Sequence, residues 1–315
     1  MVNEVKSRQV GHIAILITNI VFGVSIPIVK SALGYPGMNA NTLSFCRFLG
    51  AMLLFWGVSP FLKKEKVSVR DLGVIALASV FGIVMNQWVF MNGLSYASPF
   101  DVSLILTMGP ILTLILSFFF LREPITALKM LGVGLGAVGA VWLALFSQDT
   151  GGESGVSRVL GLVLCSASVT SYAFYLTFFK RVIDKYSAVT LMKWMFTFSS
   201  FISLPFCLGD FLHSPIVQGA AMSLYWQVLY VVVAVTFLPY FLLPIAQQRI
   251  RPTIVSMYNY AQPVLTAIVS ILIGLDTWQW GRLPSVFLIF TGVYLVTQSR
   301  SRQDGIKGTH STSGQ

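Results

Sequence analysis

Residues 99–124 read PFDVSLILTMGPILTLILSFFFLREP, and residues 252–277 read PTIVSMYNYAQPVLTAIVSILIGLDT. The two apolar stretches align without a gap at a constant separation of 153 residues. The matched pairs include Pro99 and Pro252, Ser103 and Ser256, Pro110 and Pro263, and Glu123 and Asp276, and the same register continues beyond the two stretches to Gly139 and Gly292. A register that keeps a mid-helix proline, a glycine and a carboxylate indicates an internal duplication.

The composition around these stretches is that of a membrane protein. The 315 residues are 55% apolar and 10% charged, with a mean hydropathy of +0.77, whereas soluble domains average about 25% charged residues. A helix that crosses a bilayer needs about 20 mostly apolar residues. Apolar runs of this kind cover about 11–30, 40–62, 72–92, 99–121, 127–147, 159–179, 188–208, 224–246, 253–274 and 283–298. We therefore predict an all-α integral membrane protein with ten transmembrane helices.

The 21 Lys and Arg residues, which give a net charge of +10, are distributed unevenly. With the N-terminus in the cytoplasm, only Lys30, Arg158 and Arg282 fall outside, Arg47 and Lys193 fall within spans, and the others fall inside. This is the positive-inside pattern of membrane proteins, so we expect membrane lipids rather than nucleic acid as partners. The prediction is a multi-pass protein of the cell (inner) membrane with both termini cytoplasmic.

No cofactor or metal site is expected. Cys46, Cys165 and Cys207 lie in three different spans without metal-ligand spacing. The histidines are His12, His213 and His310, which are far apart in the predicted topology. We therefore predict no catalytic residues.

A polar, glycine-rich linker at 149–157 divides the chain. We predict a first five-helix repeat at 1–148, a second at 158–299 and a disordered cytoplasmic tail at 300–315. Because five is an odd number of spans, the second repeat must insert upside down relative to the first. Two inverted five-helix repeats are a common plan of secondary transporters.

Residues 96–126, with Pro110 in mid-helix and Glu123 in the turn, resemble the fourth helix and following turn of the EamA family, in the drug/metabolite transporter (DMT) superfamily. The glycine-rich run 132–141 and the Arg47-Phe48 pair are also similar to that family, and the likeness extends over about 12–147 and 160–298. Asp276 departs from the pattern, since glutamate is usual there. The resemblance implies a transporter; the members carry amino acids, other metabolites and toxic compounds.

Polar residues within the predicted spans are the candidate site, because polar groups are expensive in hydrocarbon and often functional. Arg47 is either a clamp for a substrate carboxylate or phosphate or a structural residue that holds helix-end carbonyls or snorkels outward. Lys193 lies near the cytoplasmic end of its span, where snorkelling is favoured. The candidate substrate-binding set is Asn19, Arg47, Asn86, Gln87, Trp88, Tyr172, Tyr175, Tyr258, Asn259 and Gln262. Taken one by one, these residues are also explained by hydrogen bonds between helices.

Glu123 and Asp276 are alternative proton sites, but both lie next to a predicted helix N-terminus, where the helix dipole favours a carboxylate. The structural interpretation is preferred for both residues. Gly132, Gly136, Ala140 and Ala144 form a small-residue stripe that packs either within the chain or in a homodimer.

The sequence thus favours a secondary transporter that moves a small metabolite, amino acid-like, aromatic or amphipathic, by alternating access, with export as the expected direction. Pro27, Pro110, Pro239 and Pro263 are the predicted hinges. One alternative is a membrane-embedded enzyme acting on a lipid-linked substrate, which would need clustered acid/base or nucleophilic residues. Another is a non-transporting membrane sensor or scaffold.

Overall fold

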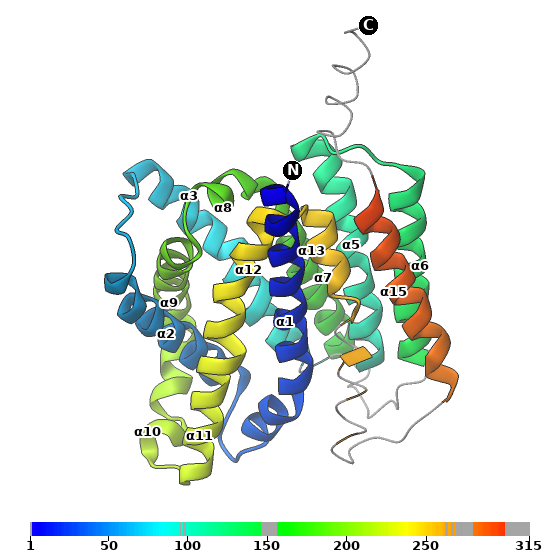
Figure 1. The fold of residues 1–315 in the computed structure, drawn as a ribbon. Helices are drawn as coiled ribbons and strands as arrows, with labels where there is room; N and C mark the ends of the chain where they lie inside the picture. Colours follow the sequence, from blue (N-terminus) through cyan, green and yellow to red (C-terminus); the bar gives the residue numbers. More distant parts are fainter. Residues whose placement is uncertain are drawn as a thin grey trace, which may run out of the picture.

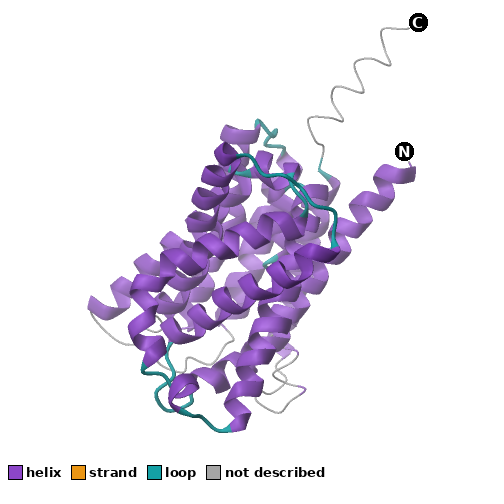
Figure 2. Cartoon of the chain, turned by 90° about the vertical axis from the view of Figure 1, so that its left-hand side faces the viewer, coloured by secondary structure: helices purple, strands orange, loops and turns teal. Residues whose placement is uncertain are grey.

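The computed structural model describes residues 2–94, 96, 99–145, 156–261, 264–265, 268, 272 and 280–299 (Figure 1). In this part of the chain all regular structure is helical (Figure 2). The first half contains α1 (Val2–Leu33), α2 (Ala40–Val58), η1 (Ser59–Phe61), α3 (Val69–Ser79), η2 (Val80–Val89), α4 (Phe90–Leu94), α5 (Pro99–Leu121) and α6 (Ala127–Leu145). The second half contains α7 (Val156–Phe178), α8 (Lys180–Lys185), α9 (Ala188–Leu212), α10 (Pro215–Gln218), α11 (Met222–Tyr230), η3 (Val231–Phe237), α12 (Leu238–Arg249), α13 (Pro252–Tyr258), η4 (Trp280–Arg282) and α15 (Leu283–Gln298).

The protein is an all-helical membrane protein, as predicted. Among the described residues, six continuous helical stretches are long and apolar enough to cross a bilayer, and Ile105–Leu121, Ala127–Trp142 and Leu283–Gln298 form shorter apolar helices. The predicted span 253–274 begins as α13, and most of its remainder lies outside the described residues. Residues 149–155 of the predicted linker and the tail at 300–315 also lie outside them.

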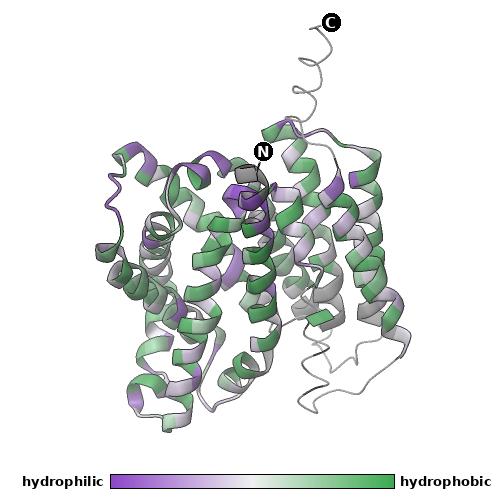
Figure 3. Ribbon diagram, in the orientation of Figure 1, coloured by the Kyte–Doolittle hydropathy of each residue, from purple (hydrophilic) through white to green (hydrophobic). Residues whose placement is uncertain are grey.

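Apolar residues predominate along the helices of the bundle (Figure 3), and many of their large side chains are exposed. Phe119 and Phe287 are 69% and 73% exposed. In water such exposure would mark a binding surface, but around a membrane span it is the lipid-facing side. A mixed apolar and aromatic core, including Phe48, Phe55 and Phe196, fills the interior.

Side chains and prolines set the starts of several helices. Asn39 caps α2 by accepting a hydrogen bond from the Thr42 amide at 2.8 Å, and Ser68 and Ser187 cap α3 and α9 in the same way. These residues satisfy amide groups that have no partner within their helix. Pro252 occupies the first turn of α13, where its missing N–H costs nothing.

Matching helices of the two halves run in opposite directions. The start of α1 packs against the end of α12, because a Cβ added at Gly11 would lie 2.9 Å from the Arg249 side chain. The segment that follows α7 reaches the same end of the bundle, where Gln248 binds the Ile183 carbonyl. We call this the inner end, following the predicted topology, and the opposite end the outer end. Since α1 begins and α7 finishes at the inner end, the repeats are inverted.

Glycines at the contact between α6 and α15 follow the two-fold symmetry that an inverted repeat requires. A Cβ added at Gly292 would lie 2.5 Å from the Gly132 carbonyl oxygen, and one at Gly139 would lie 3.0 Å from the Ser285 carbonyl oxygen. At the 153-residue separation, Gly292 corresponds to Gly139 and Ser285 to Gly132. Each contact is thus the symmetry mate of the other, which is the signature of an isologous interface.

Contacts within the chain explain two positions of the small-residue stripe of α6. Gly132 faces α15, and Gly136 faces the ring of Tyr260, since a Cβ added at Gly136 would lie 2.5 Å from a ring carbon. These two positions are therefore used for packing within the chain. The homodimer stays a prediction.

A π-helical segment interrupts the third helix of each half, η2 in the first and η3 in the second. In η3, the Leu238 amide bonds the Val233 carbonyl, and Pro239 follows directly. The wider π-helical turn makes room for the ring of Pro239, which in a regular α-helix would clash with the backbone carbonyl one turn earlier. In η2, Ser171 and Ser168 of α7 donate to the carbonyls of Phe81 and Asn86 at 2.8 and 2.7 Å.

Candidate functional site

Arg47 places a guanidinium inside the bundle. It lies on α2, is 8% exposed, and donates from Nε to Thr236 Oγ1 of η3 at 2.9 Å. Within the described part of the chain, no acidic side chain forms an ion pair with Arg47, and its terminal nitrogens have no hydrogen-bond partner. Buried charges in proteins are normally paired. The terminal nitrogens of Arg47 are therefore available to bind an anion.

Aromatic side chains and an amide lie next to this guanidinium. Tyr240, 4% exposed, interacts electrostatically with Arg47 and with the hydroxyls of Tyr172 and Tyr175. Tyr172 and Tyr175 are stacked with ring centroids 6.1 Å apart. Tyr175 OH donates to Gln247 Oε1 at 3.3 Å, while Gln247 Nε2 is buried with no hydrogen-bond partner. A cation, tyrosine rings and an amide donor thus lie side by side. We call these five residues, together with Thr236, the central cluster.

Half of the central cluster belongs to the set predicted from the sequence, namely Arg47, Tyr172 and Tyr175. Thr236, Tyr240 and Gln247 were missed, although all three lie on the eighth predicted span or directly after it. Their spacing of four and then seven residues puts them on one helical face. That stripe is a signal that the sequence contains, although the prolines of the span obscure it.

Asn19 is a predicted residue with an open hydrogen-bonding position. It is 1% exposed on α1, and its Nδ2 donates to the Ile15 carbonyl at 2.9 Å. Its Oδ1 is buried without a hydrogen-bond partner. A buried acceptor of this kind favours a ligand donor or water as its partner.

The predicted residues of η2 form their hydrogen bonds with groups other than Arg47. Trp88 Nε1 donates to Asn41 Oδ1 at 2.8 Å, and Asn41 Nδ2 donates to Asp210 Oδ2 at 2.7 Å. Asn86 Nδ2 turns back to the Gly82 carbonyl at 3.5 Å, whereas Gln87 Oε1 is buried without a hydrogen-bond partner. Trp88 therefore helps to connect η2 with α2 and α9 at the outer end of the bundle.

Tyr258 lies at the inner end, with its hydroxyl 2.9 Å from His12 Nδ1 of α1. The α-helix ends at this residue, and the Asn259 amide bonds the Ser256 carbonyl at 3.1 Å in a tightened turn. Gln262 lies outside the described residues. The predicted grouping of Asn259 with Gln262 therefore stays a prediction.

Further contacts close the inner end between the two halves. Lys185 Nζ and Tyr186 OH both donate to Asp71 Oδ2 of α3 at 2.6 Å. The hydrogen bond to Asp71 raises the pKa of Lys185. Together with the His12–Tyr258 contact, these bonds form what we call the inner seal.

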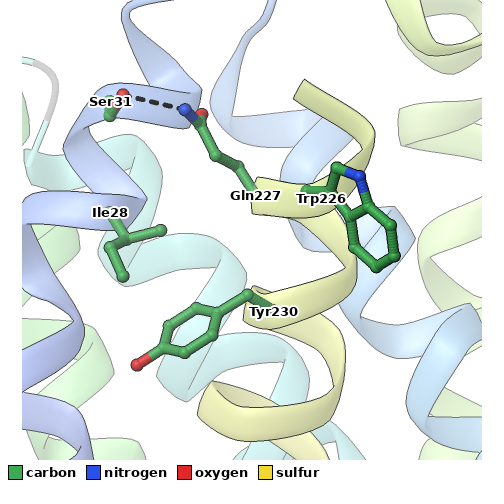
Figure 4. Close-up of a pocket in the computed structure, with 5 residues that line it drawn as sticks. All are labelled: Ile28, Ser31, Trp226, Gln227 and Tyr230. Carbon is green, nitrogen blue, oxygen red and sulfur yellow. Dashed lines mark hydrogen bonds between the residues drawn. The ribbon is translucent and has the colours of Figure 1, made fainter. Parts of the chain in front are cut away.

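An open groove of about 390 Å³ lies at the outer end between α1 and α11 (Figure 4). Its lining residues are Ile28, Ser31, Trp226, Gln227 and Tyr230. Gln227 Nε2 donates to Ser31 Oγ at 3.2 Å across it, and the Tyr230 hydroxyl lies 3.4 Å from Ser25 Oγ. Tyr230 directly precedes η3, so the groove borders the π-helical segment that contacts Arg47.

Two of the four predicted hinge prolines lie in well-defined surroundings. Pro110 is inside α5, and Tyr260 OH donates to the Thr107 carbonyl at 2.6 Å in the turn where the proline removes a backbone donor. Pro239 is the second residue of α12, directly after η3. Pro27 lies within α1, but its side chain is outside the description, as is all of Pro263. Their role as hinges stays a prediction.

The fold is an inverted repeat of membrane helices, and polar groups at its centre lack hydrogen-bond partners. These two features together are typical of polytopic transporters. Comparison with known proteins agrees. The model of the EamA-like transporter family matches residues 9–145 and again 159–298. The chain belongs to the EamA-like transporter family.

The similar proteins extend over nearly the full length of the chain. An uncharacterized transporter of Archaeoglobus fulgidus is 24% identical over 91% of this chain and 99% of its own. The uncharacterized inner membrane transporter YicL of Salmonella typhimurium is 23% identical over 94% of this chain and 98% of its own. One crystal structure shares the fold, with a TM-score of 0.75 and 17% identity over 93% of this chain and 98% of that one. The two sequence relatives are named as transporters rather than enzymes, and the family is one of transporters, so the protein is a multi-pass membrane transporter.

Proposed function

We propose that the protein is a secondary transporter that exports a small carboxylate-bearing metabolite, amino acid-like or aromatic, across the cytoplasmic membrane by alternating access. Its termini would lie in the cytoplasm, in keeping with the charge distribution of its loops. The name of the Salmonella relative, an inner membrane transporter, supports this location.

The observation that carries the proposal is the environment of Arg47. A guanidinium that is 8% exposed, with no ion-pair partner among the described acidic residues, favours an anionic ligand. Guanidinium offers a planar fork that matches a carboxylate. The rings of Tyr172, Tyr175 and Tyr240 would pack against an apolar or aromatic body, and the free donor of Gln247 would bind an acceptor on it.

A thermal-shift screen of the detergent-purified protein tests the substrate class. Amino acids and aromatic carboxylates should raise the melting temperature by mass action, whereas sugars and lipophilic cations should not. Arg47→Gln should weaken carboxylate binding roughly 10- to 150-fold, the range for losing a hydrogen bond to a charged group. An unchanged shift in this variant would remove the basis of the proposal.

Lys193→Gln is the matched control, because it also removes a cation from within a span. Lys193 Nζ donates to Ser59 Oγ at 2.9 Å and lies 4.7 Å from the Trp56 ring centroid, so it already has partners. The carboxylate shift should survive this change.

Transport itself requires a flux measurement. A carboxylate that stabilises the protein should exchange across proteoliposome membranes, and inside-out vesicles should accumulate it faster than right-side-out vesicles. Binding without exchange would instead favour a sensor, and faster entry into right-side-out vesicles would favour import.

A further inference from the structure

Thr236 makes two hydrogen bonds that join the candidate anion site to a π-helical turn. Its Oγ1 accepts from Arg47 Nε at 2.9 Å and donates to the Val231 carbonyl at 2.9 Å. Val231 is five residues back along the chain, which is the spacing of a π-helical bond. One hydroxyl, 0% exposed, therefore contacts both the guanidinium and the backbone of η3.

The backbone around Thr236 has the features of a switchable segment. The Leu238 amide already bonds five residues back, to the Val233 carbonyl. Pro239 lacks an amide hydrogen, so the turn below η3 cannot close with a full set of α-helical bonds. Single π-helical turns are rare and are frequently found at functional sites.

The corresponding segment of the first half is stabilised differently. The carbonyls of Phe81 and Asn86 in η2 accept hydrogen bonds from Ser171 and Ser168 of the neighbouring helix α7. Within the described residues, carbonyls of η2 are therefore bound by serine hydroxyls of another helix. In η3 the hydroxyl that binds a carbonyl belongs to Thr236, which also accepts a hydrogen bond from the cation Arg47. The inverted repeat does not require a hydrogen bond between Arg47 and Thr236. This bond therefore needs an explanation that is specific to η3.

We propose that Thr236 is a positioning residue that couples the occupancy of Arg47 to the conformation of η3. This inference rests on the proposed function. With Nε bound to Thr236, the guanidinium presents its two terminal nitrogens end-on to a carboxylate. An anion drawn to those nitrogens pulls the guanidinium, the Thr236 hydroxyl follows, and the bond to the Val231 carbonyl changes with it. The outer groove at Tyr230, directly before η3, would then respond to the charge bound deeper in the bundle.

The test uses two substitutions at one position. Thr236→Val keeps the shape but removes the hydroxyl, and Thr236→Ser keeps the hydroxyl but removes the methyl group. We expect Thr236→Val to lower the exchange rate of a carboxylate in proteoliposomes about tenfold, the size of one hydrogen bond to a charged group. Thr236→Ser should stay within about twofold of the parent protein. A merely structural role would lower the melting temperature of both variants without separating their exchange rates.

A reporter on η3 tests the coupling directly. Ala234→Cys is introduced after Cys46, Cys165 and Cys207 are replaced by alanine, and its reaction with a maleimide is timed with and without benzoate or phenylalanine. In the parent protein the carboxylate should change the labelling rate, and Thr236→Val should abolish that change while the thermal shift persists. A ligand-dependent change that survives in Thr236→Val overturns the coupling and leaves the proposed function intact. Both proposals are overturned if no carboxylate raises the melting temperature of the parent protein, or if Arg47→Gln leaves that thermal shift unchanged.

Discussion

Glu123 is a residue whose role the structure makes specific. Lys129 Nζ donates to Glu123 Oε2 at 2.6 Å, with side-chain exposures of 0% for the lysine and 13% for the glutamate. Thr253 Oγ1 of the second half donates to the same oxygen at 3.4 Å. The sequence favoured a structural role for this carboxylate near a helix start, and the buried lysine supplies a stronger reason for it.

Glu123→Gln should destabilise the protein strongly. The change leaves the ammonium of Lys129 buried without its compensating charge, and breaking a buried pair in this way costs about 3–5 kcal/mol. The measurement is the melting temperature, or the denaturant midpoint, of the detergent-purified variant. Adding Lys129→Met should recover most of the loss, because it removes the buried charge that has lost its partner. A double variant as unstable as Glu123→Gln would assign the effect to the contact with Thr253 instead.

At the scale of the element, α6 and α15 depend on close backbone approach. A Cβ at Gly292 would lie 2.5 Å from the Gly132 carbonyl oxygen and 2.8 Å from the Gly136 amide nitrogen. These are backbone atoms, so no rotamer change relieves the clash. Small residues at such crossings let membrane helices pack through van der Waals contact.

Gly292→Ala should therefore lower the melting temperature, with a cost of about 1–3 kcal/mol for overpacking a close contact. Gly134→Ala is the control on the same pair of helices, because a Cβ there meets nothing within 4 Å. Alanine also has the better helix propensity, so this variant should be neutral or slightly more stable. Equal losses in the two variants would mean that the helices separate easily and that the glycine contact contributes little.

The elements also show how far sequence reasoning reaches. Apolar length and the 153-residue register predicted the helical membrane fold, the duplication and the inversion, since hydrocarbon thickness and topology act on every span alike. The π-helical segment η2 was not predicted, because its carbonyls have partners on another helix, namely Ser168 and Ser171. Tyr240 and Gln247 were missed for a similar reason: their neighbours Arg47 and Tyr175 come from distant parts of the chain.

At the scale of the whole molecule, helix pairs divide into those joined at both ends and those joined at one. The pair α2 and α9 is joined at the outer end by Asn41 and Asp210 and at the inner end, beyond the helices, by Glu65 and Ser187, at 2.7 and 2.9 Å. Alternating access needs contacts that break at one end of the bundle. A pair held at both ends suits a fixed scaffold, whereas α1 and α13 meet in the inner seal.

Cross-linking separates the two kinds of pair. In a cysteine-free background, His12→Cys with Tyr258→Cys, joined by a short cleavable thiol linker, should abolish carboxylate exchange in proteoliposomes. Reduction of the linker should restore exchange, because the contact between α1 and α13 must open for substrate to enter from the cytoplasm.

The matched control joins the scaffold pair, through Trp56→Cys with Thr197→Cys. In the parent protein Trp56 Nε1 donates to Thr197 Oγ1 at 2.9 Å, so the same linker reaches between these positions. Exchange should persist when α2 and α9 are linked, because neither helix must leave the other during the cycle. If linking α2 to α9 stops exchange while linking α1 to α13 does not, the moving and fixed parts are the reverse of this assignment. Such a result would shift the opening from the contact between α1 and α13 to the contact between α2 and α9.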